Sequence, residues 1–471
     1  MRYVSTRGEA PELNFVDVML AGLARDGGLY VPVSWPTFDA KTIAGFAGKP
    51  YAEVAVEVIK PFVGDSIGEA DLARMAREAY GTFRHPATAP LVQLGDSLFV
   101  LELFHGPTLA FKDLAMQLVA RLMDHVLEQR GERTTIVVAT SGDTGGAAVE
   151  AFRGRAQADV VVLFPHGRIS EVQRRMMTSA PDNNVHALAI EGTFDDCQAL
   201  VKAMFNHHAF RDQVRLSGVN SINWARIVAQ VVYYFTAAVA LGSPHRKVAF
   251  TVPTGNFGDV YAGYVASKMG LPIDRLVVAT NVNDILVRTL TTGVYETRDV
   301  MPTASPSMDI QVSSNFERLL FETCGRNAST VRALMGSLAQ SRRFTVPADA
   351  LKQMRTLFMA DKADEQESAA TIRAWMKEAG YCADPHTAVA LAVAEKETRD
   401  PSVPMVVLST AHPAKFPDAV AAACGVTPVL PDWLADLPKR TERVSVLPAD
   451  QGQIEKFVLS ASRAAREGAA A

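Results

Sequence analysis

Short runs of apolar residues alternate with helix-like segments through the middle of the chain. Thr134–Thr140 and Asp159–Pro165 are rich in β-branched residues and are bounded by turn residues, as expected of strands buried on both faces. Each run leads through a polar turn into a segment predicted as a helix. Strands that alternate with helices predict an α/β fold with a parallel sheet and helices on both of its faces. The same strand pattern recurs in VHALAIEG, KVAFTVP, RLVVATN and VPMVVLSTA.

The first 90 residues do not follow this alternation. The segment DVMLAGLARDGGLYVP predicts a helix, a Gly-Gly stop and a short strand. A stretch rich in Pro and Ala, Arg84–Pro90, predicts a boundary before the strand SLFVLELF. At the other end of the chain, SRAAREGAAA is expected to fray, as chain ends often do.

The composition is that of a globular protein and argues against several kinds of partner. A chain of 471 residues suggests two or three domains, and 48% of the residues are hydrophobic. The net charge of -4, without a basic stripe, argues against nucleic acid. The apolar segment VAQVVYYFTAAVALG is shorter than a membrane span, so we expect a buried helix and no membrane contact.

The cysteines and the chain start favour the cytoplasm. None of the four cysteines is spaced as CxxC, which argues against a structural zinc site, and no metal site is expected. So few cysteines in so long a chain suggest a reducing compartment. The first residues, MRYVSTRGEAPELNF, lack the apolar core of a secretory signal.

The turns at the strand exits are where we look for a site, because ligands of a parallel sheet bind outside the carboxyl ends of its strands. Thr140–Gly146 (TSGDTGG) and Thr254–Asp259 (TGNFGD) offer glycines and backbone N–H groups that can hold an anion. Asn220–Arg226 (NSINWAR) adds an amide, a hydroxyl and a guanidinium, and Leu408–Phe416 (LSTAHPAKF) adds a hydroxyl. Each turn alone is equally compatible with a helix cap or an ordinary polar turn.

Lys112 stands at the front of a predicted helix in HGPTLAFKDLAMQL, between Phe111 and Leu114. The positive end of the helix and the apolar neighbours both disfavour a charged ammonium group. Either the side chain reaches out to solvent, or its pKa is lowered and it is a nucleophilic amine.

Lysines of the second kind form Schiff bases with carbonyl compounds. A Schiff-base lysine, a glycine-rich phosphate cradle and a polar contact for a ring nitrogen together indicate a pyridoxal 5'-phosphate site. The chain carries neither a Walker A loop nor a GxGxxG fingerprint that would indicate a nucleotide instead. No role is assigned to His105, His386 or His412, which lie near these motifs.

The motifs HGPTLAFKDLAMQ, ATSGDTGGAAVEAF, NSINWARIVAQVVYY, PTGNFGD and SMDIQVSSNFERLLF occur in this order. Together they resemble the threonine synthase family, in its longer bacterial and fungal type. The resemblance runs from about residue 3 to at least residue 425. The wider group is the fold-type II pyridoxal phosphate enzymes, which resemble the tryptophan synthase β subunit.

The resemblance implies a fold and a division of the chain. The expected fold has two open, mostly parallel sheets flanked by helices, plus an N-terminal α/β extension. Residues 1–90 would form the N-terminal region and residues 91–425 the cofactor-binding core, with a smaller subdomain at about 130–210. Residues 426–471 would form a C-terminal tail that packs on the core.

The resemblance also implies a role for each candidate residue. Lys112 would bind the cofactor covalently and shuttle protons, and Thr410 would face the pyridine nitrogen. The cofactor phosphate would be held by Gly255, Asn256, Phe257 and Gly258. The substrate carboxylate and the cofactor 3'-oxygen would be contacted by Thr140, Ser141, Gly142, Asp143 and Thr144. The substrate phosphate would be bound by Asn220, Ser221 and Arg226.

Asp143 departs from the pattern of the wider group, in which many relatives carry Asn at this position. Two anionic oxygens repel, so Asp143 beside the phenolic oxygen needs a shared proton or a nearby cation. The longer threonine synthases also carry Asp here.

The implied reaction converts O-phospho-L-homoserine and water to L-threonine and phosphate by γ-elimination and β-addition, the last step of threonine biosynthesis. It needs two anion sites, and the turns GNFGD and NSINWAR supply two candidates. A phospho-amino-acid lyase, a serine or threonine dehydratase and a non-catalytic cofactor-binding α/β protein remain alternatives. The expected partner is the small-molecule substrate, and the expected assembly is a monomer or homodimer.

Overall fold

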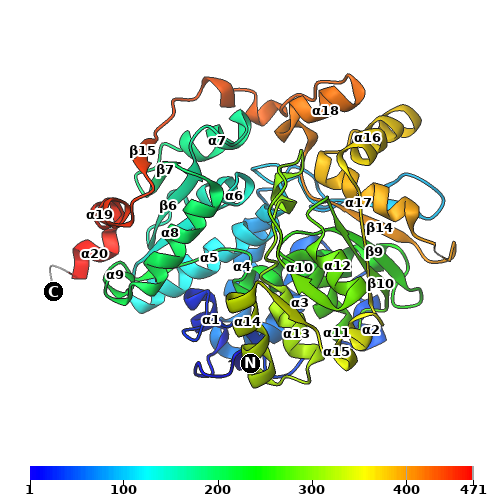
Figure 1. Cartoon of the computed structure of the whole chain (residues 1–471), viewed down its shortest axis with the longest axis horizontal. Helices are drawn as coiled ribbons and strands as arrows, with labels where there is room; N and C mark the ends of the chain where they lie inside the picture. The colour runs from blue at the N-terminus through cyan, green and yellow to red at the C-terminus, as the bar shows by residue number, and fades with distance from the viewer. Residues whose placement is uncertain (399, 469–471) are drawn as a thin grey trace.

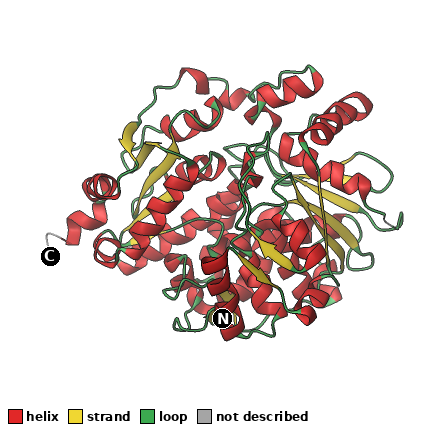
Figure 2. Cartoon of the chain, viewed as in Figure 1, coloured by secondary structure: helices red, strands yellow, loops and turns green. Residues whose placement is uncertain are grey.

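The computed structural model describes residues 1–398 and 400–468. Its two main sheets lie side by side, each flanked by helices (Figures 1 and 2). The larger sheet is on the right of Figure 1 and the smaller one on the left. The predicted fold class, with two open and mostly parallel sheets, is confirmed.

The larger sheet runs parallel except at one edge. Its order is β13 (Phe358–Lys362), β10 (Ile273–Thr280), β9 (Val248–Pro253), β14 (Met405–Ser409), β4 (Leu98–Glu102) and β3 (Leu91–Gln93). Only β3 pairs antiparallel. Val100 and Val407 pack towards helix α17 (Pro385–Lys396), whereas Leu101 and Leu408 face the main core. Because both faces are buried there, the inner strands β9 and β14 are nearly continuous apolar runs in the sequence.

The smaller sheet is parallel throughout. Its order is β15 (Ser445–Pro448), β7 (Val185–Glu191), β6 (Ala158–Pro165), β5 (Thr134–Ala139) and β8 (Leu216–Ser217). Val137 and Val161 pack with α8 (Phe194–Asn206) and α19 (Gln451–Ala461), while Val138 and Val162 face the main core. The inner strands β5 and β6 are therefore also buried on both sides.

The C-terminal tail completes the smaller sheet. It passes from α18 (Pro417–Cys424) over the top of Figure 1 to β15, which pairs with β7. The predicted fraying of SRAAREGAAA is wrong for α20 (Arg463–Gly468). Arg463 Nε lies 2.7 Å from Asp159 Oδ1, and the Asp159 side chain is buried, so it needs this cation. Residues 469–471 of that stretch lie outside the described residues.

The N-terminal region shares the main core with the rest of the chain. The predicted helix and strand are α1 (Phe15–Ala21) and β2 (Tyr30–Pro32), and β2 pairs antiparallel with β1 (Tyr3–Ser5). Helices α3 (Tyr51–Val63) and α4 (Glu69–Tyr80) pack on α10 (Trp224–Ala240) and α5 (Lys112–Arg130). The boundaries predicted near residues 90 and 425, and the subdomain at about 130–210, stay predictions.

The other elements surround these sheets. The remaining helices are α2 (Ala40–Ala44), α6 (Asp143–Phe152), α7 (Glu171–Thr178), α9 (His208–Gln213), α11 (Gly258–Lys268), α12 (Ile285–Thr292), α13 (Phe316–Thr323), α14 (Ala328–Ser341), α15 (Ala348–Met354) and α16 (Glu365–Ala379). A further two-stranded sheet pairs β11 (Val294–Glu296) with β12 (Arg343–Thr345). The 3-10 helices are η1 (Gly64–Ser66), η2 (Pro306–Met308), η3 (Pro413–Lys415), η4 (Asp432–Leu434) and η5 (Leu437–Lys439).

The apolar segment VAQVVYYFTAAVALG lies mostly in α10, which is buried along most of its length, as predicted. Within residues 1–398 and 400–468, no helix has the length and apolar character needed to cross a membrane.

Candidate active site

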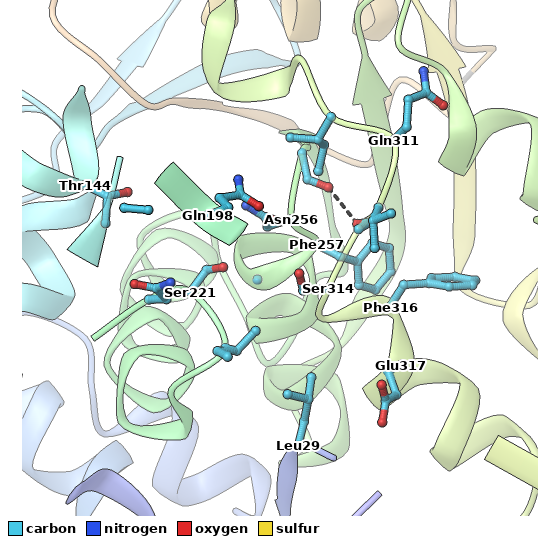
Figure 3. A pocket seen from close by; sticks show the side chains of 18 of the residues that line it. Leu29, Thr144, Gln198, Ser221, Asn256, Phe257, Gln311, Ser314, Phe316 and Glu317 are labelled. Carbon is cyan, nitrogen blue, oxygen red and sulfur yellow. Dashed lines mark hydrogen bonds between the residues drawn. The ribbon is translucent and has the colours of Figure 1, made fainter. Parts of the chain in front are cut away.

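A cavity of about 1250 Å³ lies where strand exits from both sheets meet. The loops that follow β5, β8, β9 and β14 line it, together with the start of α5. Figure 3 shows Thr144 on one side of this cavity and Phe257 and Phe316 on the other. The predicted site residues that line it are Lys112, Thr140, Ser141, Asp143, Thr144, Asn220, Ser221, Arg226, Gly255, Asn256, Phe257, Gly258 and Thr410. Gly142 lies in the same loop but is not among the lining residues.

Lys112 is the first residue of α5 and is only 9% exposed. Its Nζ lies 4.6 Å from the centroid of the Phe111 ring and 3.5 Å from Asp143 Oδ2. Burial lowers the pKa of Lys112 below its ordinary value. Asp143 opposes this shift, whereas the positive charges of Lys415 and Arg226 reinforce it. The side chain is thus held away from water, and the alternative in which it snorkels to solvent does not hold.

Asp143 is paired with a second lysine that the sequence analysis did not single out. Lys415 Nζ lies 2.7 Å from Asp143 Oδ1, and neither side chain is exposed. Burial alone would raise the pKa of Asp143, but Lys415 and then Lys112 outweigh it and hold the pKa below its ordinary range. The cation that Asp143 was expected to need is therefore present.

The loop that leaves β5 is organised by Thr140. Its Oγ1 accepts hydrogen bonds of 2.9 Å from the N–H groups of Gly142 and Gly145. Gly142 has a φ of 139°, and a Cβ there would lie 2.4 Å from the Gln173 side chain. Only glycine fits this position, so Gly142 shapes the loop that carries Ser141 and Thr144 to the cavity.

The loop that leaves β9 presents free backbone donors at the start of α11. In the described part of the chain, the N–H groups of Gly255, Asn256, Phe257 and Gly258 donate no hydrogen bond. Ser313 Oγ donates to Gly255 O at 2.6 Å, which ties the loop down from outside. N–H groups that converge at a helix N-terminus form a cradle for a phosphate.

The loop between β8 and α10 places a buried guanidinium at the cavity. Arg226 is 2% exposed and its Nη1 donates to Val219 O at 3.1 Å. Arg226 Nε and Asn220 Oδ1 are buried without a hydrogen-bond partner among the described residues. Burial lowers the pKa of Arg226 to about 10, and no carboxylate forms an ion pair with it in this part of the chain. Such a group is suited to bind an anionic ligand.

Thr410 follows β14, and it places the exit of this strand next to Lys112. Its carbonyl accepts a hydrogen bond of 2.8 Å from Phe111 N, so the strand exit lies beside Lys112. His386 also reaches the cavity, although the sequence suggested no role for it. His386 Nδ1 lies 2.8 Å from Asp384 Oδ1, and its Nε2 accepts from Ser307 N at 3.2 Å. His386 thus joins η2 to the start of α17.

Asp259 is a further lining residue that the sequence analysis did not assign. Its Oδ1 accepts hydrogen bonds from the hydroxyls of Tyr233 and Tyr234, whereas its Oδ2 is buried without a partner among the described residues. Burial raises the pKa of Asp259 to about 6, and the two tyrosine hydrogen bonds only partly oppose this.

The residues around the cavity fit pyridoxal phosphate. A buried lysine of lowered pKa can react with an aldehyde, and the free N–H groups of the β9 exit loop can donate hydrogen bonds to a phosphate. The buried Arg226, whose Nε has no partner among the described residues, can bind a second anion.

Three protein families match successive parts of the chain. The family described as threonine synthase N terminus matches residues 2–80, pyridoxal-phosphate dependent enzyme matches residues 82–410, and threonine synthase, C-terminal matches residues 387–458. The threonine synthase of Pseudomonas aeruginosa is 53% identical over 459 residues, which cover 97% of this chain and 98% of that protein.

Solved structures agree with these matches. A crystal structure of PLP-bound threonine synthase from Brucella melitensis is 62% identical, with a TM-score of 0.95, and covers 98% of this chain and 100% of its own. The structure of threonine synthase from yeast is 38% identical with a TM-score of 0.92, and the match covers 98% of both chains.

Proposed function

The chain belongs to the threonine synthase family of pyridoxal-phosphate-dependent enzymes, and from that premise we propose that the cavity around Lys112 is its active site. The protein is a lyase that converts O-phospho-L-homoserine and water to L-threonine and phosphate. The observation that carries the assignment of the site is the burial of Lys112 at a cavity that two groups of anion-binding donors also line.

Lys112 and the β9 exit loop would hold the cofactor. The Lys112 amine would bind its aldehyde carbon, and the N–H groups of Gly255, Asn256, Phe257 and Gly258 would bind its phosphate. Thr410 would offer a hydroxyl to the ring nitrogen, which leaves that nitrogen less firmly protonated than a carboxylate would. When bound, pyridoxal phosphate supplies an electron-withdrawing ring that stabilises negative charge at the substrate carbons.

Lys112 would move the protons of the reaction. As a neutral amine it accepts the proton from the substrate α carbon, and as an ammonium group it returns protons later. A single group can serve as base and then as acid because its pKa lies closer to neutrality than that of an exposed lysine.

Arg226, Asn220 and Ser221 would bind the phosphate of the substrate. The unpaired Nε of Arg226 can donate to a phosphate oxygen and stabilise the charge that gathers as phosphate leaves. This second anion site distinguishes the phosphorylated substrate from a plain amino acid.

The loop from Thr140 to Thr144 would bind the substrate carboxylate. Ser141 and Thr144 line the cavity, and the loop leads into the N-terminus of α6. Because Gly142 fixes the path of this loop, its role is to place these donors rather than to touch the substrate itself.

Product analysis tests the proposal directly. With O-phospho-L-homoserine, we expect equal amounts of phosphate and threonine, and Lys112→Ala should lower kcat by more than about a thousand-fold. Phosphate release with a product that lacks the new hydroxyl group would indicate a lyase without water addition. Full activity of Lys112→Ala would remove the assignment of the lysine.

Location and assembly stay predictions. We expect the protein to act in the cytoplasm as a monomer or homodimer, without nucleic acid or membrane partners. Size-exclusion chromatography with light scattering measures the assembly, and a larger oligomer would contradict that prediction.

A further inference from the structure

Lys415 is a fully buried lysine with no part in the reaction derived so far. It ends η3, in the loop that follows β14, and its side chain is 1% exposed. Its Nζ donates to Thr108 O at 2.8 Å and lies 2.7 Å from Asp143 Oδ1. Burying an ammonium group costs free energy unless it is paired, and these two oxygens provide the pairing. The question is what the buried pair of Lys415 and Asp143 does for the site.

The Asp143 carboxylate joins Lys415 to Lys112. Its Oδ1 accepts from Lys415 and, at 3.0 Å, from Gln173 Nε2, while its Oδ2 points to Lys112 Nζ at 3.5 Å. Gln173 accepts in turn from Ser170 Oγ at 3.2 Å. One oxygen is thus fixed by two donors, and the other remains directed at Lys112.

Charge balance shows what this arrangement does to Lys112. Asp143 on its own would form an ion pair with Lys112 and favour the ammonium form. The charge of Lys415 offsets part of the effect of Asp143 on Lys112, and Arg226 on α10 adds a further positive charge nearby. Lys112 itself affects the buried Asp259 on α11, so Asp259 also faces this group.

The carboxyl groups around Lys415 come from two helices, and the titratable His412 lies near it at the start of η3. Asp143 lies at the start of α6, and Asp113 on α5 accepts from the N–H and hydroxyl of Thr108 at 2.7 Å each. Burial raises the pKa of Asp113 to about 6, and Lys415 opposes that rise. Asp143 is the one of the two carboxyls that contacts Lys415 directly.

We propose that Lys415 is a positioning residue whose ammonium group neutralises and orients Asp143, so that Lys112 can become a neutral amine beside a carboxylate. The proposal rests on the proposed role of Lys112. This role of Lys415 explains how Asp143 can lie beside Lys112 without keeping Lys112 in its charged form.

The test follows the absorbance of the cofactor as a function of pH in the cofactor-loaded protein. The midpoint of this titration is the pH at which half of the molecules carry a proton on the Lys112 nitrogen. Lys415→Met should raise the midpoint by about 1–3 pH units, because Asp143 is left as an unbalanced anion. Lys415→Arg should keep the midpoint near that of the wild type. An unchanged midpoint in a folded Lys415→Met variant overturns the proposal.

A second pair of variants covers the case in which Lys415→Met does not fold. Asp143→Asn removes the carboxylate, and adding Lys415→Met to it removes the cation without leaving a buried anion. The double variant should titrate at least about 1 unit above Asp143→Asn, because the field of Lys415 is then lost. Equal midpoints in these two variants overturn the proposal.

A remote ion pair gives the matched control. Lys362 Nζ lies 2.7 Å from Asp284 Oδ2, the same N–O separation, but outside the residues that line the cavity. Lys362→Met should leave the midpoint unchanged, and a shift as large as that of Lys415→Met would overturn the proposal.

In the full chain stripped of cofactor, the pH dependence of acetylation at Lys112, read by mass spectrometry, should shift in the same direction. That readout does not need the cofactor to sit on Lys112, so it separates a failure of this inference from a failure of the proposed function. An acetylation profile of Lys112 that is the same in the wild type and in Lys415→Met overturns the inference.

Discussion

Replacing Arg226 by Met should make the protein more stable and remove its response to phosphate. The guanidinium is 2% exposed, makes one hydrogen bond to Val219 O, and leaves Nε without a partner among the described residues. The buried charge of Arg226 therefore lowers the free energy of unfolding of the protein without an anion at this site. A bound anion would offset that loss.

The size of the effect follows from the pKa. The fall of the Arg226 pKa from 12.5 to about 10 is about 2.5 units, or roughly 3 kcal/mol against the charged form in the folded state. Loss of the hydrogen bond to Val219 O reduces the expected gain in stability by about 1 kcal/mol. Because the folded-state pKa of this base is lowered, the full cost is present below about pH 10 and fades as the pH rises further. At neutral pH we expect a net gain of about 2 kcal/mol.

Urea unfolding of the cofactor-loaded protein, with and without inorganic phosphate, measures both effects. Phosphate should stabilise the wild type, because it binds only the folded state, and should not stabilise Arg226→Met. Arg318→Met is the matched control, since this buried guanidinium, whose pKa burial also lowers to about 10, donates to Tyr30 O, Ile222 O and Asn315 Oδ1. The substitution Arg318→Met should destabilise the protein, because it removes all three of these hydrogen bonds. A loss of stability in Arg226→Met, or equal protection by phosphate, would refute the reasoning.

Three further variants test other parts of the structure. Gly255→Ala would place a methyl group 2.6 Å from Ser307 O, so a fluorescence titration should show pyridoxal phosphate binding at least about tenfold weaker, or about 1.4 kcal/mol; unchanged affinity would contradict this. Asp259→Asn should stabilise the protein by roughly 3 kcal/mol at pH 8 and hardly at all below pH 4, because the raised pKa of about 6 against 3.8 costs stability only as the pH rises through that range; an equal gain in urea melts at both pH values would be inconsistent with a buried carboxyl. Arg463→Ala leaves the buried Asp159 without its cation and with only the backbone N–H of residue 463 as a donor, so the free energy of unfolding should fall by about 3 kcal/mol. A change below measurement error would show that the side chain of Arg463 does not anchor the C-terminal helix.

The strand-and-turn pattern was enough to predict a parallel α/β sheet and the strand-exit loops that reach the cavity, and the family resemblance supplied the division into two sheets. Short apolar runs such as Thr134–Thr140 have few ways to bury both faces, and their exits must meet at the carboxyl edge of a sheet. Lys112 stood out because apolar neighbours and a helix N-terminus both disfavour its charge. Which residues of the lining touch substrate or cofactor stays a prediction.

Lys415, Asp259 and His386 escaped prediction because their roles depend on tertiary contacts. Lys415 was visible in the motif LSTAHPAKF, but nothing in the spacing indicates that it reaches Asp143, more than 250 positions earlier in the sequence. The repulsion between Asp143 and the phenolic oxygen of the cofactor did predict that a shared proton or a nearby cation was needed. The strand β15 was also missed, since SVLP is too short and too exposed to carry a clear pattern.

Reduction of the cofactor-loaded protein with borohydride, followed by peptide mass mapping, tests the central claim most directly. The account predicts that the phosphopyridoxyl mass is found on the peptide that contains Lys112, and that Lys112→Ala carries no such label. A label on Lys415 or on any other lysine in the wild-type protein, or no label at all, would contradict it.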